Sequence, residues 1–100
     1  MEDYILKDDV EVAIALAQMG HPVRLKILRM TIKSGVSGVS VGQLKDDLNI
    51  PGSTLTHHLQ CLIKVDLISQ QRDKQKLYCV ANLKKMNSIF KYINEDCCRI

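Results

Sequence analysis

The sequence predicts a mainly helical fold with one small β-hairpin, in the order α-α-α-α-β-β-α. Apolar residues recur at helical spacing in five segments, and two β-leaning runs stand before the last of them. Hydrophobic residues make up 46% of the chain, but Phe90 and three tyrosines are its only aromatic residues. An aliphatic core of this kind favours packed helices over a β-sandwich. A chain of 100 residues buries one small core, so we expect a single domain over residues 1–100.

The N-terminal half of the chain predicts two helices. Asp8 or Asp9 can cap the first helix, and Gly20 ends it. His21 and Pro22 begin the second helix, which runs to about Lys33, because proline suits the first helical position. The first helix carries an unusually wide apolar surface, formed by Val10, Val12, Ala13, Ile14, Leu16 and Ala17.

Residues 40–63 predict two short helices joined by a tight turn. Ser40 and Gln43 form a capping box at the start of the first helix, and Ser53 stands where the second helix would be capped. The turn lies at residues 49–52, where Pro51 lacks a backbone donor and Gly52 tolerates a positive φ. A short extended or loop segment, residues 36–39, leads into this unit.

The second helix of this pair has a polar outer face and an apolar inner face. On a helical wheel the outer face holds Ser53, Thr56, His57, Gln60 and Lys64, and the inner face holds Leu55, His58, Leu59, Leu62 and Ile63. Small donors, acceptors and one cation suit base edges and phosphates in the major groove of DNA. The alternative is an ordinary solvated amphipathic helix.

A basic hairpin and a last helix complete the chain. Residues 67–72 and 76–80 predict two strands joined through residues 73–75, and Arg72, Lys74 and Lys76 make the hairpin tip basic. Asn82 can cap a last helix that begins at about Leu83. Its apolar stripe is expected to hold Leu83, Met86, Ile89, Phe90 and Ile93, with Lys84, Lys85 and Lys91 off the stripe. A helix-turn-helix followed by such a wing is a winged helix-turn-helix.

The net charge is +3, but it is unevenly distributed: −4 over residues 1–20, +8 over residues 21–91 and −1 over residues 92–100. A basic middle fits a polyanionic partner, because neutralised phosphates release counterions. No apolar run reaches the roughly 18 residues needed to span a bilayer, and the acidic start is unlike a signal peptide. We therefore expect a cytoplasmic protein with no membrane partner.

The chain resembles the ArsR/SmtB family of metal- and metalloid-responsive bacterial repressors. The likeness is carried by residues 15–17, 21–28, 41–44 and 53–59, by Leu62, by residues 67–68 and by a wing ending in Tyr78. The resemblance implies a homodimer built through the first and last helices, with its two recognition helices about 34 Å apart on an operator. We expect Thr54, Thr56, His57 and Gln60 near base edges and Lys64, Arg72, Lys74 and Lys76 on phosphates, with Ser53 also at the DNA.

Histidine and cysteine side chains on the recognition helix have simpler interpretations as well. We expect His58 to be partly buried and hydrogen-bonded to backbone. His57 faces outward and is assigned to DNA; its spacing from Cys61 can also hold a metal, but only two ligands are visible and the metal would sit on the DNA-facing side. Cys61 and Cys79 are most simply core or semi-core residues.

Cys97 and Cys98 are the candidate sensor. Their α-carbons are about 3.8 Å apart, below the usual minimum of about 4.4 Å for a disulfide. Two reduced thiols side by side instead chelate a thiophilic ion. The ending also resembles that of arsenite sensors with vicinal cysteines, which implies an As(III) or Sb(III) inducer. The third thiolate ligand stays open among Cys79, Cys61, a partner subunit's cysteine and a small thiol.

Other functions remain as alternatives. A thiol-redox or persulfide-responsive repressor, or a winged helix without a sensor site, would have the same fold. A module used only for protein contact would show no steep salt dependence of nucleic-acid affinity. An enzyme is not expected, because the chain has no Cys-x-x-Cys, P-loop or nucleophile-elbow pattern, and no cofactor is required.

Overall fold

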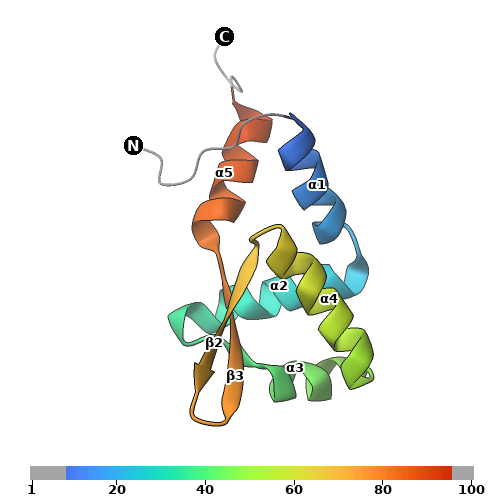
Figure 1. The fold of residues 1–100 in the computed structure, drawn as a ribbon. Helices are drawn as coiled ribbons and strands as arrows, with labels where there is room; N and C mark the ends of the chain where they lie inside the picture. Colours follow the sequence, from blue (N-terminus) through green and yellow to red (C-terminus); the bar gives the residue numbers. More distant parts are fainter. Residues whose placement is uncertain (1–8, 96–100) are drawn as a thin grey trace.

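The computed structural model describes residues 9–95 and has a winged helix-turn-helix fold, as the sequence predicts (Figure 1). Its helices are α1 (Asp9–Met19), α2 (Pro22–Ser34), α3 (Val41–Leu48), α4 (Gly52–Lys64) and α5 (Leu83–Asn94). A short 3-10 turn, Gly35–Ser37, follows α2. The strands are β1 (Val39–Ser40), β2 (Ile68–Asp73) and β3 (Lys76–Ala81).

The wing is an antiparallel sheet of three strands in the order β1-β3-β2, not the two strands that the sequence predicts. The hairpin register runs from Ile68 opposite Ala81 to Asp73 opposite Lys76. The additional strand lies in the segment expected to be extended or loop, where Val39 pairs with Cys79. Because β1 leads directly into α3, this pairing joins the wing to the helix-turn-helix.

Three helices begin with a side-chain cap, of which those at Ser40 and Asn82 were predicted and that at His21 was not. His21 caps α2 through Nδ1, which accepts from the Val23 amide at 3.1 Å. Ser40 caps α3 by accepting from the Gln43 amide at 3.0 Å. Asn82 caps α5 by accepting from the Lys85 amide at 3.1 Å. These side chains satisfy amides that the first helical turn leaves without partners.

Two details of the predicted capping are wrong. Gln43 does not complete the capping box, because its side-chain amide donates to Asp47 Oδ1 at 2.8 Å, one turn further along α3. Ser53 does not cap α4 either, since the helix begins at Gly52 and its N-cap, Pro51, makes no side-chain hydrogen bond. Ser53 therefore stands inside the first turn, with its side chain exposed.

The core is aliphatic and lies where the five helices meet the inner end of the sheet. Its fully buried members include Ile27, Leu28, Leu44, Leu55, Leu62, Leu67, Ile68, Cys79 and Ile89. Leu55, Leu59 and Leu62 place the inner face of α4 in this core, as predicted. The opposite face of α4 is thereby left at the surface.

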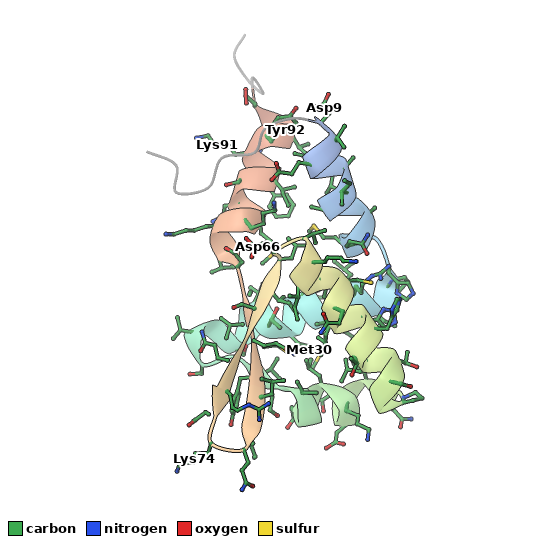
Figure 2. The ribbon with its side chains drawn as sticks, in the orientation of Figure 1. Asp9, Met30, Asp66, Lys74, Lys91 and Tyr92 are labelled. Carbon is green, nitrogen blue, oxygen red and sulfur yellow. The ribbon has the colours of Figure 1, made fainter. Side chains whose placement is uncertain are left out.

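Helices α1 and α5 lie side by side at the end of the molecule opposite the wing tip (Figure 1). Lys85, expected off the apolar stripe, is instead 3% exposed, because its ammonium pairs with Glu11 of α1 at 3.1 Å. The Tyr92 hydroxyl contacts Asp9 at the far end of the same pair (Figure 2). Within the described residues, no helix is long and apolar enough to cross a membrane.

Candidate nucleic-acid interface

The outer face of α4 is polar and exposed along its length. Its predicted DNA-facing residues are all exposed in the structure: Ser53, Thr54, Thr56, His57, Gln60 and Lys64. They are held there because the inner face is fixed by buried leucines one helical turn apart. A helix anchored on one side with short polar side chains on the other can enter a major groove without losing its core contacts.

The wing adds three cations at its tip. Arg72, Lys74 and Lys76 are exposed, and they come from the paired ends of β2 and β3 and from the turn between them. Lys74 has a φ of 60°, a conformation that non-glycine residues rarely adopt. Figure 2 shows Lys74 at the tip of the hairpin, well away from the body of the protein. Cations in this position can reach phosphates on either side of a groove.

The wing, α3 and the first turn of α4 lie at one end of the molecule (Figure 1). A groove of about 570 Å³ separates the start of α3 from the hairpin. Arg72 and Lys76 line it on one side, and Gly42 and Gln43 line it on the other. The sequence analysis did not place these two α3 residues at the interface; the cap at Ser40, which fixes the start of α3, is the signal that could have done so.

His57 and Cys61 lie close together on α4, but they do not form a metal centre. His57 Nε2 and Cys61 Sγ are 3.8 Å apart. Nowhere between residues 9 and 95 do three or more histidine, cysteine, aspartate or glutamate side chains gather in a way that could hold a metal ion. The exposed imidazole of His57 therefore stays available at the outer face.

His58 is buried, as predicted, but its expected hydrogen bond to backbone is not found at Nδ1. The side chain is 7% exposed, and Nδ1 has no hydrogen-bond partner. The ring packs instead against the His21 ring, with a centroid distance of 4.6 Å. Burial, followed by the electrostatic effects of His21, Arg24 and His57, lowers the pKa of His58.

The cysteines of the described region differ in access. Cys79 is fully buried in β3, and burial raises the pKa of its thiol, against a smaller opposing effect of the hydrogen bond from Gln70. That bond joins Gln70 Nε2 to Cys79 Sγ at 3.7 Å. Cys61 is partly exposed, and both thiols are free. The predicted sensor residues, Cys97 and Cys98, lie outside the described residues.

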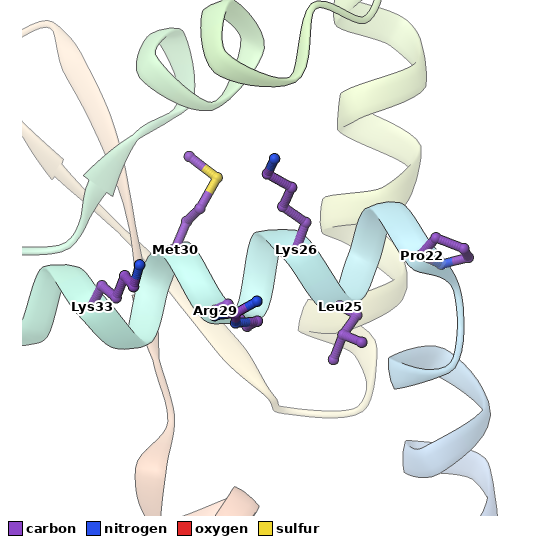
Figure 3. Close-up of a pocket in the computed structure, with 6 residues that line it drawn as sticks. All are labelled: Pro22, Leu25, Lys26, Arg29, Met30 and Lys33. Atoms are coloured by element: carbon purple, nitrogen blue, oxygen red, sulfur yellow. The ribbon is translucent and has the colours of Figure 1, made fainter.

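A further hollow, of about 460 Å³, lies along α2 (Figure 3). All of its lining residues belong to that helix: Pro22, Leu25, Lys26, Arg29, Met30 and Lys33. A ligand pocket encloses its ligand between several walls. This hollow has a single wall, so we assign no ligand to it.

Comparison with known proteins agrees with this geometry. Residues 19–71 match the family model described as "Helix-turn-helix domain". The chain is 38% identical over 73 residues to the HTH-type transcriptional regulator YgaV of Escherichia coli, and the match covers 72% of each protein. These relatives are transcriptional regulators and not enzymes.

Similar solved structures include HlyU from Vibrio cholerae, at 24% identity and a TM-score of 0.70, over 89% of this chain and 97% of that one. NolR from Sinorhizobium fredii is 26% identical with a TM-score of 0.66, over 94% and 96% of the two chains. An ArsR-like transcriptional regulator from a Rhodococcus species has a TM-score of 0.72 at 19% identity, over 85% and 77%. With its wing, its exposed α4 face and these matches, the chain belongs to the helix-turn-helix family of transcriptional regulators, in the winged form that ArsR-like regulators share.

Proposed function

We propose that the chain is a homodimeric repressor that binds an operator through α4 and the wing, and that a thiophilic metalloid releases it. The exposed polar face of α4, fixed from behind by buried leucines, is the observation that carries the DNA-binding half. Thr54, Thr56, His57 and Gln60 face base edges in this proposal. Lys64, Arg72, Lys74 and Lys76 neutralise phosphates, and Ser53 contacts DNA from the first turn of α4.

The dimer is supported by apolar side chains that the α1–α5 end leaves exposed. Their exposed fractions are 64% for Val10, 51% for Ile14, 51% for Leu83, 50% for Phe90 and 55% for Ile93. Large apolar side chains exposed on two adjacent helices are costly for a monomer, because water stays in contact with them. A second copy covering these side chains would leave the outer face of α4 exposed on both subunits.

The sensor half rests on the chemistry of Cys97 and Cys98. Adjacent thiolates supply two soft ligands to As(III) or Sb(III). Of the two described cysteines, Cys61 is accessible as a third ligand, whereas Cys79 is buried with a raised pKa. Ligand binding just beyond α5 would change the packing of the dimer helices and so the separation of the two α4 helices, with a coupling of about 1–3 kcal/mol.

A fluorescence-anisotropy titration of a labelled operator duplex tests the DNA-binding half. For the wild type, the logarithm of affinity should fall linearly with the logarithm of salt concentration. Arg72→Gln and Lys76→Gln should each reduce that slope by about 1. Lys91→Gln, on α5 and away from the wing, is the matched control and should leave the slope unchanged. A wild-type affinity independent of salt would instead indicate a protein-contact module.

Arsenite added to the preformed complex tests the sensor half. We expect wild type to lose about 5–150-fold in operator affinity, the range of a 1–3 kcal/mol coupling. The double variant Cys97→Ser, Cys98→Ser should bind the operator normally and not respond. Cys79→Ser serves as a control that keeps the response. Unchanged release from the double variant would refute the assignment of these two cysteines.

A further inference from the structure

The chain's three histidines gather where the start of α2 meets the inner face of α4. His58 is 7% exposed, and its neighbours on that face, Leu55 and Leu62, are buried. The ring centroids of His21 and His58 are 4.6 Å apart, and those of His57 and His58 are 5.7 Å apart. The His58 Nδ1 atom and the Arg24 Nε atom are both buried without a hydrogen-bond partner.

The ionisable groups that lower the pKa of His58 are all bases, so any charge that they carry is positive. His21 and Arg24 face it from α2, and His57 faces it from its own helix. The carboxylates of the other packed helices are engaged elsewhere: Asp9 and Glu11 of α1 bond to Tyr92 and Lys85, and Asp46 and Asp47 of α3 are exposed. A proton on His58 would therefore place a cation in a buried site beside Arg24, with no counter-ion among residues 9–95.

The protonation state of His58 also affects His21, which caps α2. His21 Nδ1 accepts the Val23 amide at 3.1 Å, so this nitrogen must carry no proton while the cap is formed. A charged His58, with its ring centred 4.6 Å from that of His21, would repel any positive charge on the capping residue. The contact between α2 and α4 thus depends on two imidazoles that are both uncharged.

We propose that neutral His58 is a positioning residue for DNA binding, which seats α4 on the start of α2, and that its protonation displaces the recognition helix. The proposal rests on the proposed DNA-binding function, because α4 presents the residues that would read the operator. It adds a pH dependence that a merely structural histidine would not give. Operator binding should weaken below the ordinary range of histidine titration, about pH 6.5.

Operator affinity measured by anisotropy at about pH 7.5 and about pH 5.5 tests the proposal. Because a pKa below about 6.5 leaves at least about a tenth of His58 neutral at about pH 5.5, wild type should lose up to about tenfold more affinity between the two pH values than His58→Leu, which places an apolar side chain in the core, or His58→Gln. His57→Gln is the comparison on the same helix: it should bind more weakly at both pH values and still lose at least as much affinity between them as wild type, because His57 contributes to lowering the pKa of His58. Circular dichroism at both pH values establishes that each variant is folded. Equal losses in wild type and a folded His58 variant would overturn the proposal.

A nuclear magnetic resonance titration of wild type tests, without any variant, whether protonation of His58 moves α4. The imidazole of His58 should titrate below about pH 6.5, and the amide signals of α4 should move with the same midpoint. A midpoint at or above that value, or α4 signals that do not follow it, would overturn the proposal. If wild type binds no operator at about pH 7.5, the proposed function fails, whereas this titration still judges the placement of α4 by His58.

Discussion

Replacing Gly38, which precedes β1, with alanine should destabilise the fold more than the same change at Gly35 or Gly42. Gly38 has φ 77° and ψ 178°, a region that essentially only glycine adopts, at a cost of about 1–3 kcal/mol for other residues. A Cβ atom there would lie 2.7 Å from the Cys79 carbonyl oxygen and 2.8 Å from Val80 Cγ2. The first contact is with the backbone of the central strand, which cannot move without disturbing its pairing with β1.

Strain and overlap together predict a loss of about 3 kcal/mol or more in the free energy of unfolding. Alanine substitutions at two other glycines separate the contribution of backbone strain from that of steric overlap. Gly35 has φ 63° but no atom within 4 Å of its Cβ position, so Gly35→Ala should show strain alone. Gly42 stands in the first turn of α3 with its nearest neighbour at 4.0 Å, so Gly42→Ala should stabilise by about 0.5–1 kcal/mol.

Urea denaturation followed by circular dichroism measures all three variants on one scale. The expected order of stability is Gly42→Ala, wild type, Gly35→Ala and Gly38→Ala, from highest to lowest. If Gly38→Ala were no less stable than Gly35→Ala, the overlap of the added Cβ with the Cys79 carbonyl oxygen would not lower the free energy of unfolding. The packing assigned to the base of the wing would then be wrong.

Three further predictions concern other parts of the chain. Glu11→Gln should lower the free energy of unfolding by about 1–3 kcal/mol, because it takes the paired carboxylate from the buried Lys85 ammonium; an unchanged thermal midpoint would contradict this. In a variant without the two C-terminal cysteines, a thiol reagent should modify native Cys61 much faster than Cys79. The free energy of unfolding should also decline as pH rises above about 8.5, because the folded Cys79 thiol, with its raised pKa, keeps a proton that the unfolded thiol loses. Cys79→Ala should flatten that decline. Lys74→Gly should raise stability by about 0.5–1 kcal/mol by relieving its positive φ, while its operator affinity falls and the salt slope decreases by about 1; a destabilised variant would contradict the first part.

Local signals were sufficient for most helix boundaries. The caps at His21, Ser40 and Asn82 are each made by a side chain to an amide two or three residues away, so the sequence contains both partners. The exposed and buried faces of α4 follow from periodicity alone, since Leu55, Leu59 and Leu62 recur at helical spacing. For this reason the exposed polar residues of α4 could be named before the fold was known.

The features that the sequence did not predict depend on distant contacts. β1 is two residues long and exists because Val39 meets Cys79, forty positions away. Lys85 is buried because Glu11 of α1 lies beside α5, which no pattern within α5 reveals. The capping box is the local exception, because the Gln43 side chain had both Ser40 and Asp47 within reach and its amide donates to Asp47.

The preference of the protein for its operator over random DNA tests the central claim, that the outer face of α4 recognises a specific sequence, most directly. Competition anisotropy at fixed salt should show the duplex from upstream of its own gene binding about 10³-fold or more tighter than a scrambled duplex. Gln60→Ala, a change at an exposed position, should reduce that ratio by about tenfold and leave binding to the scrambled duplex unaltered. Equal competition by the two duplexes, or an unchanged affinity ratio in Gln60→Ala, would contradict the claim that this face of α4 recognises a specific sequence.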